Sequence, residues 1–166
     1  MVGPGIVRPF DTLAFIGGVQ AVKTFENSDG TSFDAVKLYN ATGAVLGAGR
    51  PYIIGYEGDE ETTPFVFVAT AAIAFPVWQV IAVSATAVAA WDWFGYRGVM
   101  PTVAILGTTG VKDDHFHLSA AAPTGLTEAA AQPARTLATI GVLTETAGSA
   151  GNYRFILYGE RAQVAA

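Results

Sequence analysis

The chain has 166 residues, of which 51% are hydrophobic and 14% are charged. A charged fraction well below the ~25% of an average soluble domain, combined with so much apolar sequence, excludes intrinsic disorder for most of the chain. The net charge of −5 and the nine scattered basic residues exclude nucleic acid as a main partner, because neutralising phosphates requires clustered Lys and Arg.

The first eighteen residues differ in composition from the rest. Glycines and prolines, among them Pro4 and Pro9, prevent regular structure there, and no basic region followed by an unbroken apolar stretch marks a secretory signal. The segment nevertheless carries large apolar side chains that a solvated tail does not need: Ile6, Val7, Phe10, Leu13, Phe15 and Ile16. We expect an extended N-terminal arm over residues 1–18, which either folds back on its own core or adds a strand to a partner's sheet.

A single β-rich domain is expected over residues 19–166. Turn signals recur at short intervals there, and β-branched and aromatic runs of strand length lie between them. The expected strands lie near residues 19–25, 35–39, 50–55, 65–72, 77–84, 89–96, 102–106, 115–118, 136–144 and 153–158. Residues 125–135 are rich in alanine and fit either a short helix or an extended loop. The pattern predicts an all-β fold, a small β-barrel or β-sandwich with at most one short helix, and shows no convincing tandem repeat.

Residues 62–91 contain no charged side chain and are long enough on paper to cross a bilayer. Pro64 and Pro76 interrupt this run, however, and both of its flanks are acidic. A spanning helix usually carries Lys or Arg at its cytoplasmic end. Two buried strands and a turn explain the composition better, so we expect no membrane association.

The two histidines of the chain lie two residues apart, at His115 and His117. On a strand both would face the same side, together with Asp113, so the three could reach one metal ion. A His-x-His pair is a weak signal, because a catalytic zinc site needs three protein ligands with supporting hydrogen bonds. We therefore expect no metal and no cofactor, and keep these three residues as the one weak candidate site.

No catalytic pattern stands out elsewhere. The chain has no cysteine, no serine in a Gly-x-Ser-x-Gly turn, and no Lys-Ser or Lys-Thr after the glycines at 47–49. We expect that the chain is not an enzyme. The aromatic residues Trp91, Trp93 and Tyr96 are expected in a core or a subunit interface, since a nucleic-acid stacking platform requires a basic surround.

Three stretches, 33–56, 87–119 and 134–159, together resemble a known family. They contain a tryptophan strand at 90–98, a Thr-Thr-Gly-Val turn at 108–111, and closing strands at 139–143 and 153–158. This order is similar to that of the small head decoration, or cement, proteins of tailed bacteriophages.

The resemblance implies a structural virion protein that binds the outer surface of the capsid, on the major capsid protein, and bridges capsomers as a homotrimer. The capsid-binding element would be the arm, through Ile6, Val7, Phe10, Leu13 and Phe15. Two alternatives stay open: another virion component, such as a head fibre base or a tail tube subunit, and a monomeric β-barrel that binds a small apolar or sugar ligand.

Overall fold

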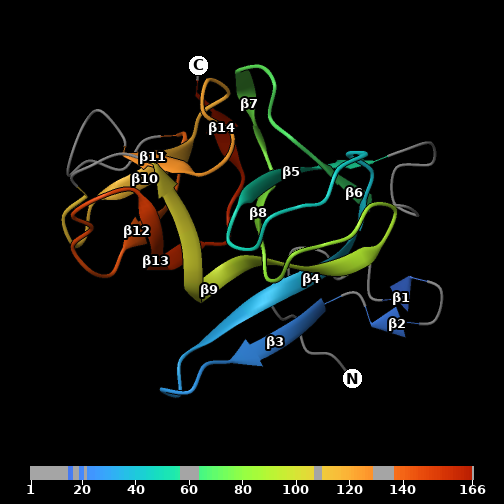
Figure 1. Ribbon diagram of the computed structural model, residues 1–166, viewed down its shortest axis with the longest axis horizontal. Coiled ribbons are helices and arrows are strands. Elements are labelled where there is room, and N and C mark those ends of the chain that lie inside the picture. The colour runs from blue at the N-terminus through green and yellow to red at the C-terminus, as the bar shows by residue number, and fades with distance from the viewer. Residues whose placement is uncertain are drawn as a thin grey trace, which may run out of the picture.

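The computed structural model describes residues 15–16, 19–20, 22–56, 64–106, 110–128 and 137–165. Every regular element in these residues is a strand, which confirms the all-β prediction (Figure 1). The strands are β1 (Phe15–Ile16), β2 (Val19–Gln20), β3 (Val22–Glu26), β4 (Ser32–Asn40), β5 (Pro51–Tyr56), β6 (Pro64–Phe67), β7 (Ile73–Val77), β8 (Gln79–Ala82), β9 (Trp91–Leu106), β10 (His115–Leu118), β11 (Leu126–Glu128), β12 (Thr139–Leu143), β13 (Gly151–Tyr158) and β14 (Ala162–Val164).

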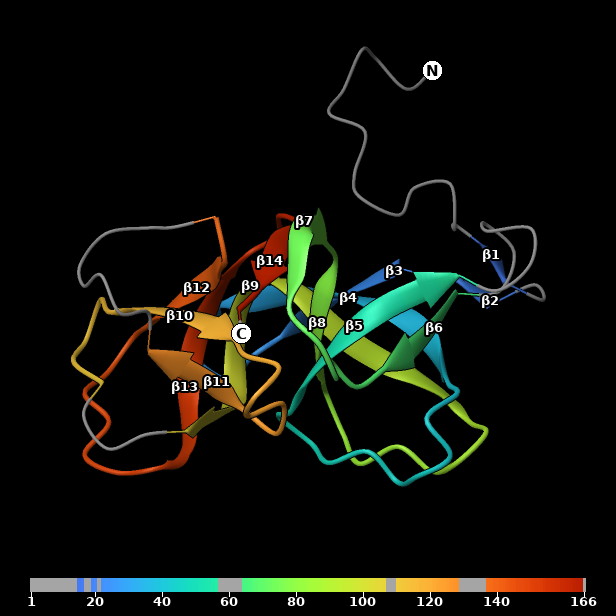
Figure 2. The ribbon, with the colours of Figure 1, turned by 90° about the horizontal axis from the view of Figure 1, so that it is seen from above.

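Ten strands form one mixed sheet whose pairings make two circuits (Figures 1 and 2). The first circuit runs β4–β9–β8–β5–β6 and returns to β4, and the second runs β9–β13–β12–β10–β11 and returns to β9. The parallel seams that close them, β6 on β4 and β11 on β9, are each only two residue pairs long. Each circuit is therefore closer to two small sheet layers facing across a core than to a regular closed barrel, so the sandwich form of the prediction describes the molecule.

The two circuits have the same topology, which the sequence did not reveal. The strands β4, β5, β6, β8 and β9 of the first circuit correspond in that order to β9, β10, β11, β12 and β13 of the second. In each circuit the second strand pairs antiparallel with the third, and the third pairs parallel with the first. A fourth strand pairs with the second, and a fifth pairs with both the first and the fourth. Strand β9 is the fifth strand of the first circuit and the first strand of the second.

Strand β9 joins the circuits because it changes partners along its length. Residues 91–98 pair with β4, and residues 97–105 pair with β13. Two separate strands were expected here, near 89–96 and 102–106, but the strand runs through Gly98 and Pro101 without a break. Gly98 continues the strand with a φ of 94°, and Pro101 lies where the register with β13 shifts, so its missing N–H costs the ladder nothing.

The first circuit encloses one apolar cluster, and a second cluster fills the second circuit and continues onto β4, β5 and β8. The first is filled by side chains that include Val36, Leu38, Tyr52, Ile54, Val66, Val80, Phe94 and Tyr96. The second includes Met100, Val103, Phe116, Leu118, Leu126, Leu143, Phe155 and Leu157. The rings of Phe116 and Phe155 meet edge to face with their centroids 5.8 Å apart, a favourable aromatic geometry.

A separate two-stranded sheet, β7 with β14, lies between the circuits (Figure 2). Neither strand was among those expected, although an expected strand began at Val77, the last residue of β7. The buried Gln79 side chain fastens this sheet to β8 by donating to the carbonyl oxygens of Ala162 and Gln163, at 3.1 and 3.0 Å. The uncharged run at 62–91 thus contributes β6, β7 and β8, and the described residues contain no helix long and apolar enough to cross a membrane.

Two expectations fall partly outside the described residues. Of the segment at 125–135, Leu126–Glu128 forms β11 rather than a helix, and residues 129–136 are not described. Of the expected arm, Phe15–Ile16 forms β1 and pairs with β2, whereas residues 1–14 are not described.

Candidate functional site

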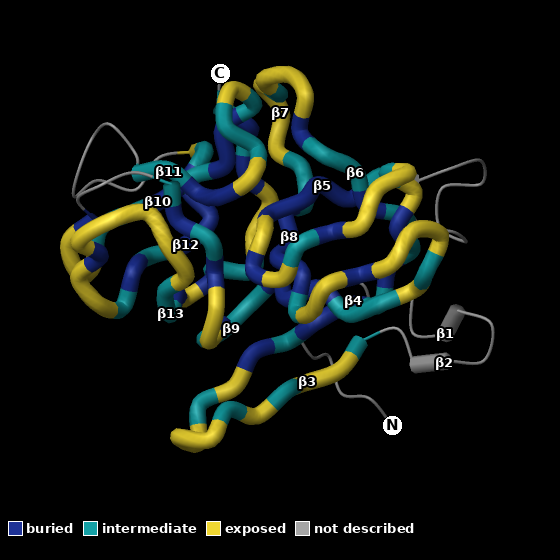
Figure 3. The backbone as a smooth tube through the Cα atoms, viewed as in Figure 1, coloured by how far each residue is buried: buried dark blue, intermediate teal, exposed yellow. Residues whose placement is uncertain are grey.

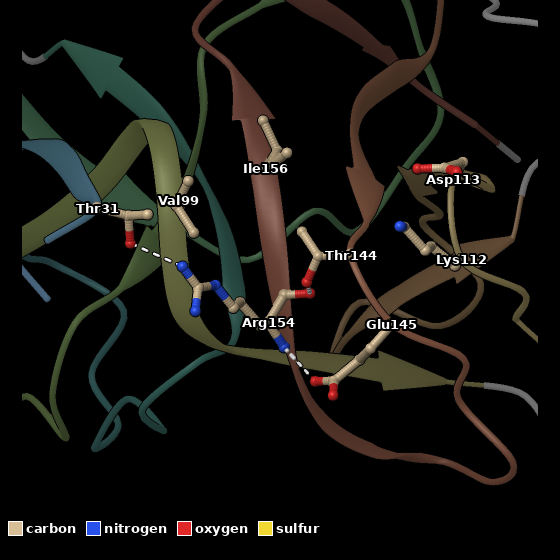
Figure 4. Close-up of a pocket in the computed structure, with 8 residues that line it drawn as sticks. All are labelled: Thr31, Val99, Lys112, Asp113, Thr144, Glu145, Arg154 and Ile156. Carbon is tan, nitrogen blue, oxygen red and sulfur yellow. Dashed lines mark hydrogen bonds between the residues drawn. The ribbon is translucent and has the colours of Figure 1, made fainter. Parts of the chain in front are cut away.

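A pocket of about 490 Å³ lies where the β3–β4 turn approaches the second circuit (Figure 4). Its lining comes from that turn, from β9 and β13, and from the β9–β10 and β12–β13 loops. The lining residues are Thr31, Val99, Lys112, Asp113, Thr144, Glu145, Arg154 and Ile156. The lining brings acidic and basic side chains together, as a catalytic or polar-ligand site requires.

Arg154 dominates this pocket, and its contacts hold the structure together. Its guanidinium donates to Thr31 Oγ1 at 2.7 Å and forms an ion pair with Asp29, while its main-chain N–H donates to Glu145 at 3.1 Å (Figure 4). The hydrogen bond from the Thr31 hydroxyl, followed by that from Arg154, holds the pKa of Asp29 well below its usual range. Arg154 therefore ties the β3–β4 turn to β13.

The rest of the pocket offers no catalytic arrangement. Its lining contains neither histidine nor cysteine, and the Thr144 hydroxyl is hydrogen bonded to the carbonyl oxygen of Arg154 at 2.9 Å. Lys112 and Asp113 are exposed on the loop before β10. The other lining hydroxyl, that of Thr31, donates to Asp29 and accepts from Arg154, so both lining hydroxyls are engaged in hydrogen bonds within the protein.

A second pocket, of about 270 Å³, is apolar. It is lined by Ile54, Phe75, Pro76, Val77, Trp78 and Arg161. The Arg161 guanidinium lies 5.7 Å from the Trp78 ring centroid, and Phe75 is 68% exposed beside it. This recess can seat an apolar group but brings no pair of titratable groups together.

The structure does not gather the candidate metal ligands into one set. His115 Nδ1 lies 2.6 Å from the Tyr158 hydroxyl, whereas His117 Nε2 lies 3.2 Å from the Thr127 hydroxyl. Asp113 is exposed in a turn with a φ of 73°. Burial lowers the pKa of His117. In the described part of the chain, no three or more acidic or histidine side chains are placed to hold a metal ion.

The three aromatic residues expected at an interface occupy different environments. Trp91 is 37% exposed and lies 5.6 Å from Tyr39, and Trp93 is half-buried. Tyr96 is only 2% exposed and packs edge to face on Trp78, so it belongs to the core of the first circuit. It alternates with Trp91 and Trp93 along β9, and its face of the strand points into the first circuit.

The arm residues Ile6, Val7, Phe10 and Leu13 lie outside the described residues, and Phe15 forms part of β1.

The sequence did not single out a surface formed by one face of β3, β4 and β9. Its solvent-facing or half-buried side chains are Lys23, Phe25, Lys37, Tyr39, Trp91 and Trp93, and we call it the aromatic–lysine face. On the same side of β4, Phe33 and Ala35 are buried, and Phe25 and Trp93 pack against them. Lys23 Nζ lies 4.8 Å from the Phe25 ring centroid, and Lys37 Nζ lies 5.8 Å from that of Trp93. Phe25 in turn stacks on Phe33 at 5.2 Å and meets Trp93 edge to face at 5.7 Å. Alternation within 33–39 indicated that Lys37 and Tyr39 share a face, but only the strand pairing brings Lys23 and Trp93 beside them.

No protein-family model and no curated protein sequence matches this chain. Among solved structures, it is similar to the N base of the head fibre protein gp8.5 of bacteriophage phi29. The TM-score is 0.48 and the identity 11%, over 76% of this chain and 97% of that chain. A likeness of this degree concerns the path of the chain alone, and it assigns neither a family nor a function.

Proposed function

We propose that this chain is a non-enzymatic structural protein of a tailed-bacteriophage virion. It would be a head decoration protein that binds the outer surface of the major capsid protein shell as a homotrimer and bridges neighbouring capsomers. The resemblance of its three sequence stretches to decoration proteins supports this proposal.

One structural observation carries the proposal: the two loops at the end of the first circuit are exposed but uncharged. Residues 41–49 and 83–90 contain no acidic or basic side chain, and Val45 and Val88 are 69% and 48% exposed. The loops lie side by side, because Leu46 pairs with Thr86 (Figure 3). Solvent-facing loops are usually polar, whereas the centres of protein interfaces are depleted of charge. We infer that these loops are covered in the assembly.

Several small contacts of this kind suit adhesion to a repetitive shell. Each contact is weak alone, but subunits held together as a trimer engage the shell with a high effective concentration. In the second circuit, Val111 is also exposed, next to the corresponding bridge between Gly110 and Ala147.

The test is co-sedimentation of the purified chain with undecorated shells from the phage whose genome encodes it. We expect saturable binding, a trimer by light scattering, and loss of binding on deleting residues 1–18, with the circular dichroism of the body retained. Val45→Asp combined with Val88→Asp should also weaken binding, whereas Thr102→Asp, a matched change at an exposed position of β9, should not. The proposal fails if the intact chain does not bind shells, or if it is absent from purified virions.

A head fibre base is the alternative function, and the similar phi29 protein is the N base of a head fibre. Purified virions would distinguish the two functions. A fibre base would occupy few positions and carry a distal fibre, whereas a decoration protein would cover a lattice of equivalent positions. A ligand-binding barrel has less support, because the described interiors of both circuits are filled by their own side chains.

A further inference from the structure

Strand β3, which carries Lys23 and Phe25 of the aromatic–lysine face, is the last strand of the sheet order and lies at its outer edge (Figures 1 and 3). Among the described residues β3 pairs with β4 alone, so its second edge has no described strand beside it. Lys23, Thr24 and Glu26 are all exposed. An edge of this kind is a template on which another extended chain can form main-chain hydrogen bonds.

The turn after β3 shows which residues face that edge. The N–H of Asn27 donates to the carbonyl oxygen of Thr31 at 2.7 Å, so Asn27 is bonded toward β4. Bonded and non-bonded positions alternate along an antiparallel pair. Phe25 and Lys23 are therefore bonded toward β4 as well, whereas Val22, Thr24 and Glu26 direct their N–H and C=O groups toward the outer edge.

The charge of the adjoining face limits what can lie there. The chain has three lysines, and two of them, Lys23 and Lys37, belong to the aromatic–lysine face. No acidic side chain belongs to this face over residues 22–26, 33–39 and 91–95, although the chain as a whole carries a net charge of −5. Asp34 points to the other face, where it forms an ion pair with Arg97. A locally cationic face on an acidic protein complements an acidic partner.

We propose that β3 and the aromatic–lysine face form a docking site for an acidic, extended segment of a partner protein. The segment adds a strand to the outer edge of β3, with main-chain hydrogen bonds to Val22, Thr24 and Glu26. Alternate side chains of the added strand lie on the side of Lys23 and Lys37, where carboxylates meet the ammonium groups and apolar groups meet Phe25 and Trp93. Single-stranded nucleic acid fits less well, because two lysines neutralise too little phosphate charge.

The test needs no capsid, so its result is independent of the proposed function. The full ¹⁵N-labelled chain is titrated with an eight-residue peptide of alternating Glu and Val and observed by NMR. We expect chemical-shift changes concentrated at the amides of Val22, Thr24 and Glu26 and at the indole N–H of Trp93. Two parallel titrations use a peptide of alternating Lys and Val and an eight-nucleotide oligothymidine, for which we expect no such changes.

Variants separate the charge from the fold. Lys23→Glu combined with Lys37→Glu should weaken peptide binding about tenfold, because both charge contacts become repulsive. Lys112→Glu makes the same change at the remaining lysine, which is exposed on the second circuit, and should leave binding unchanged. No shift at β3 with the acidic peptide, equal binding of the two peptides, equal loss in Lys112→Glu, or binding of the oligothymidine alone would each overturn the proposal.

Discussion

The main-chain N–H of Leu46 donates to the carbonyl oxygen of Thr86 at 2.9 Å, and the N–H of Thr86 donates back to that of Leu46 at 3.1 Å. This bridge joins the β4–β5 loop to the β8–β9 loop. In the second circuit, the N–H of Ala147 donates to the carbonyl oxygen of Gly110 at 2.8 Å between the corresponding loops. Each circuit thus has two loops that are hydrogen bonded to each other at equivalent positions. The likeness of the two circuits therefore extends from the strand order to the loops.

The turn that follows the bridge recurs in three of these loops. Three residues beyond Leu46, Thr86 and Gly110 the chain reaches Gly49, Ala89 and Asp113, with φ angles of 75°, 55° and 73°. Each of the three donates its N–H to the end of a neighbouring strand, at Ala82, Asn40 and Leu143 respectively. One left-handed residue at this point is therefore part of the loop design, and only one of the three positions holds the residue that adopts it without cost.

Replacing Ala89 with glycine should stabilise the protein. A left-handed alanine costs about 1 kcal/mol relative to glycine, and the substitution removes no described side-chain contact beyond one methyl group. We expect Ala89→Gly to raise the free energy of unfolding by about 0.5–1 kcal/mol in urea titrations. Ala87→Gly is the control: it lies in the same exposed loop without a positive φ, and should be neutral or slightly destabilising. A less stable Ala89→Gly protein would contradict this account of the loop.

Removing the side chain of Asn40 should destabilise the first circuit. Its Nδ2 donates to the carbonyl oxygens of Ala44 and Ala87 at 2.8 and 2.9 Å, and its Oδ1 accepts from the Thr42 hydroxyl at 2.7 Å. The amide is buried and joins the β4–β5 and β8–β9 loops, so Asn40→Ala leaves several polar groups without partners. We expect a loss of about 2–3 kcal/mol in urea unfolding. Asn152→Ala, at an exposed position of β13, should change stability by less than about 0.5 kcal/mol.

The half-buried His117 should make stability depend on pH below neutrality. Burial lowers its pKa from 6.5 in the folded protein, so the unfolded chain takes up the proton first as the pH falls. Its contribution is complete above pH 6.5 and is lost as the pH falls through that value. The midpoint of urea unfolding should therefore drop between pH 7 and 5, and by a smaller amount in His117→Gln.

Asp29 provides the control for that titration, because its carboxyl group titrates at lower pH than the His117 imidazole. Its folded pKa is depressed from 3.8, so its stabilising effect is present above that value and is lost only as the pH falls further. Asp29→Asn should leave the change between pH 7 and 5 intact. If His117→Gln shows the same drop as the unaltered chain, His117 is not its source.

The sequence predicted a strand correctly where apolar and polar residues alternate without an interrupting glycine or proline. His115–Leu118 has the expected bounds, and Tyr153–Tyr158 lies within β13. In both runs, buried residues such as Phe116, Phe155 and Leu157 alternate with less buried ones. The prediction failed where tertiary pairing overrides a local signal. Pro76 lies inside β7, and β9 continues through Gly98 and Pro101. The two prolines are tolerated because each lies at a position where the ladder needs no N–H donor.

The surfaces were harder to predict than the strands. Alternation along β9 separates Tyr96 from Trp91 and Trp93, but it does not say which face meets a core, and Tyr96 proved to be buried. The aromatic–lysine face depends on β3 lying beside β4 and on β4 lying beside β9, and the β4–β9 partners lie about 50 to 65 residues apart in the chain. The shared topology of the two circuits is invisible for the same reason, since the matching loops differ in length and composition.

Gly98 tests the junction between the circuits. A Cβ placed on it would lie 2.5 Å from the carbonyl oxygen of Ser32 and 2.9 Å from the Cα of Phe33, and its φ of 94° already disfavours a side chain. Gly98→Ala should therefore cost about 3 kcal/mol or more, because both main chains at the β4–β9 crossing must shift. Gly43→Ala is the matched control: its φ is 76°, but a Cβ there meets nothing within 4 Å, so only the conformational cost of about 1 kcal/mol applies. Urea unfolding of both variants measures the difference. If the two variants lost the same free energy of unfolding, the main chains of β4 and β9 would be able to move apart at Gly98 at little cost. The two circuits would then not be held rigidly through β9.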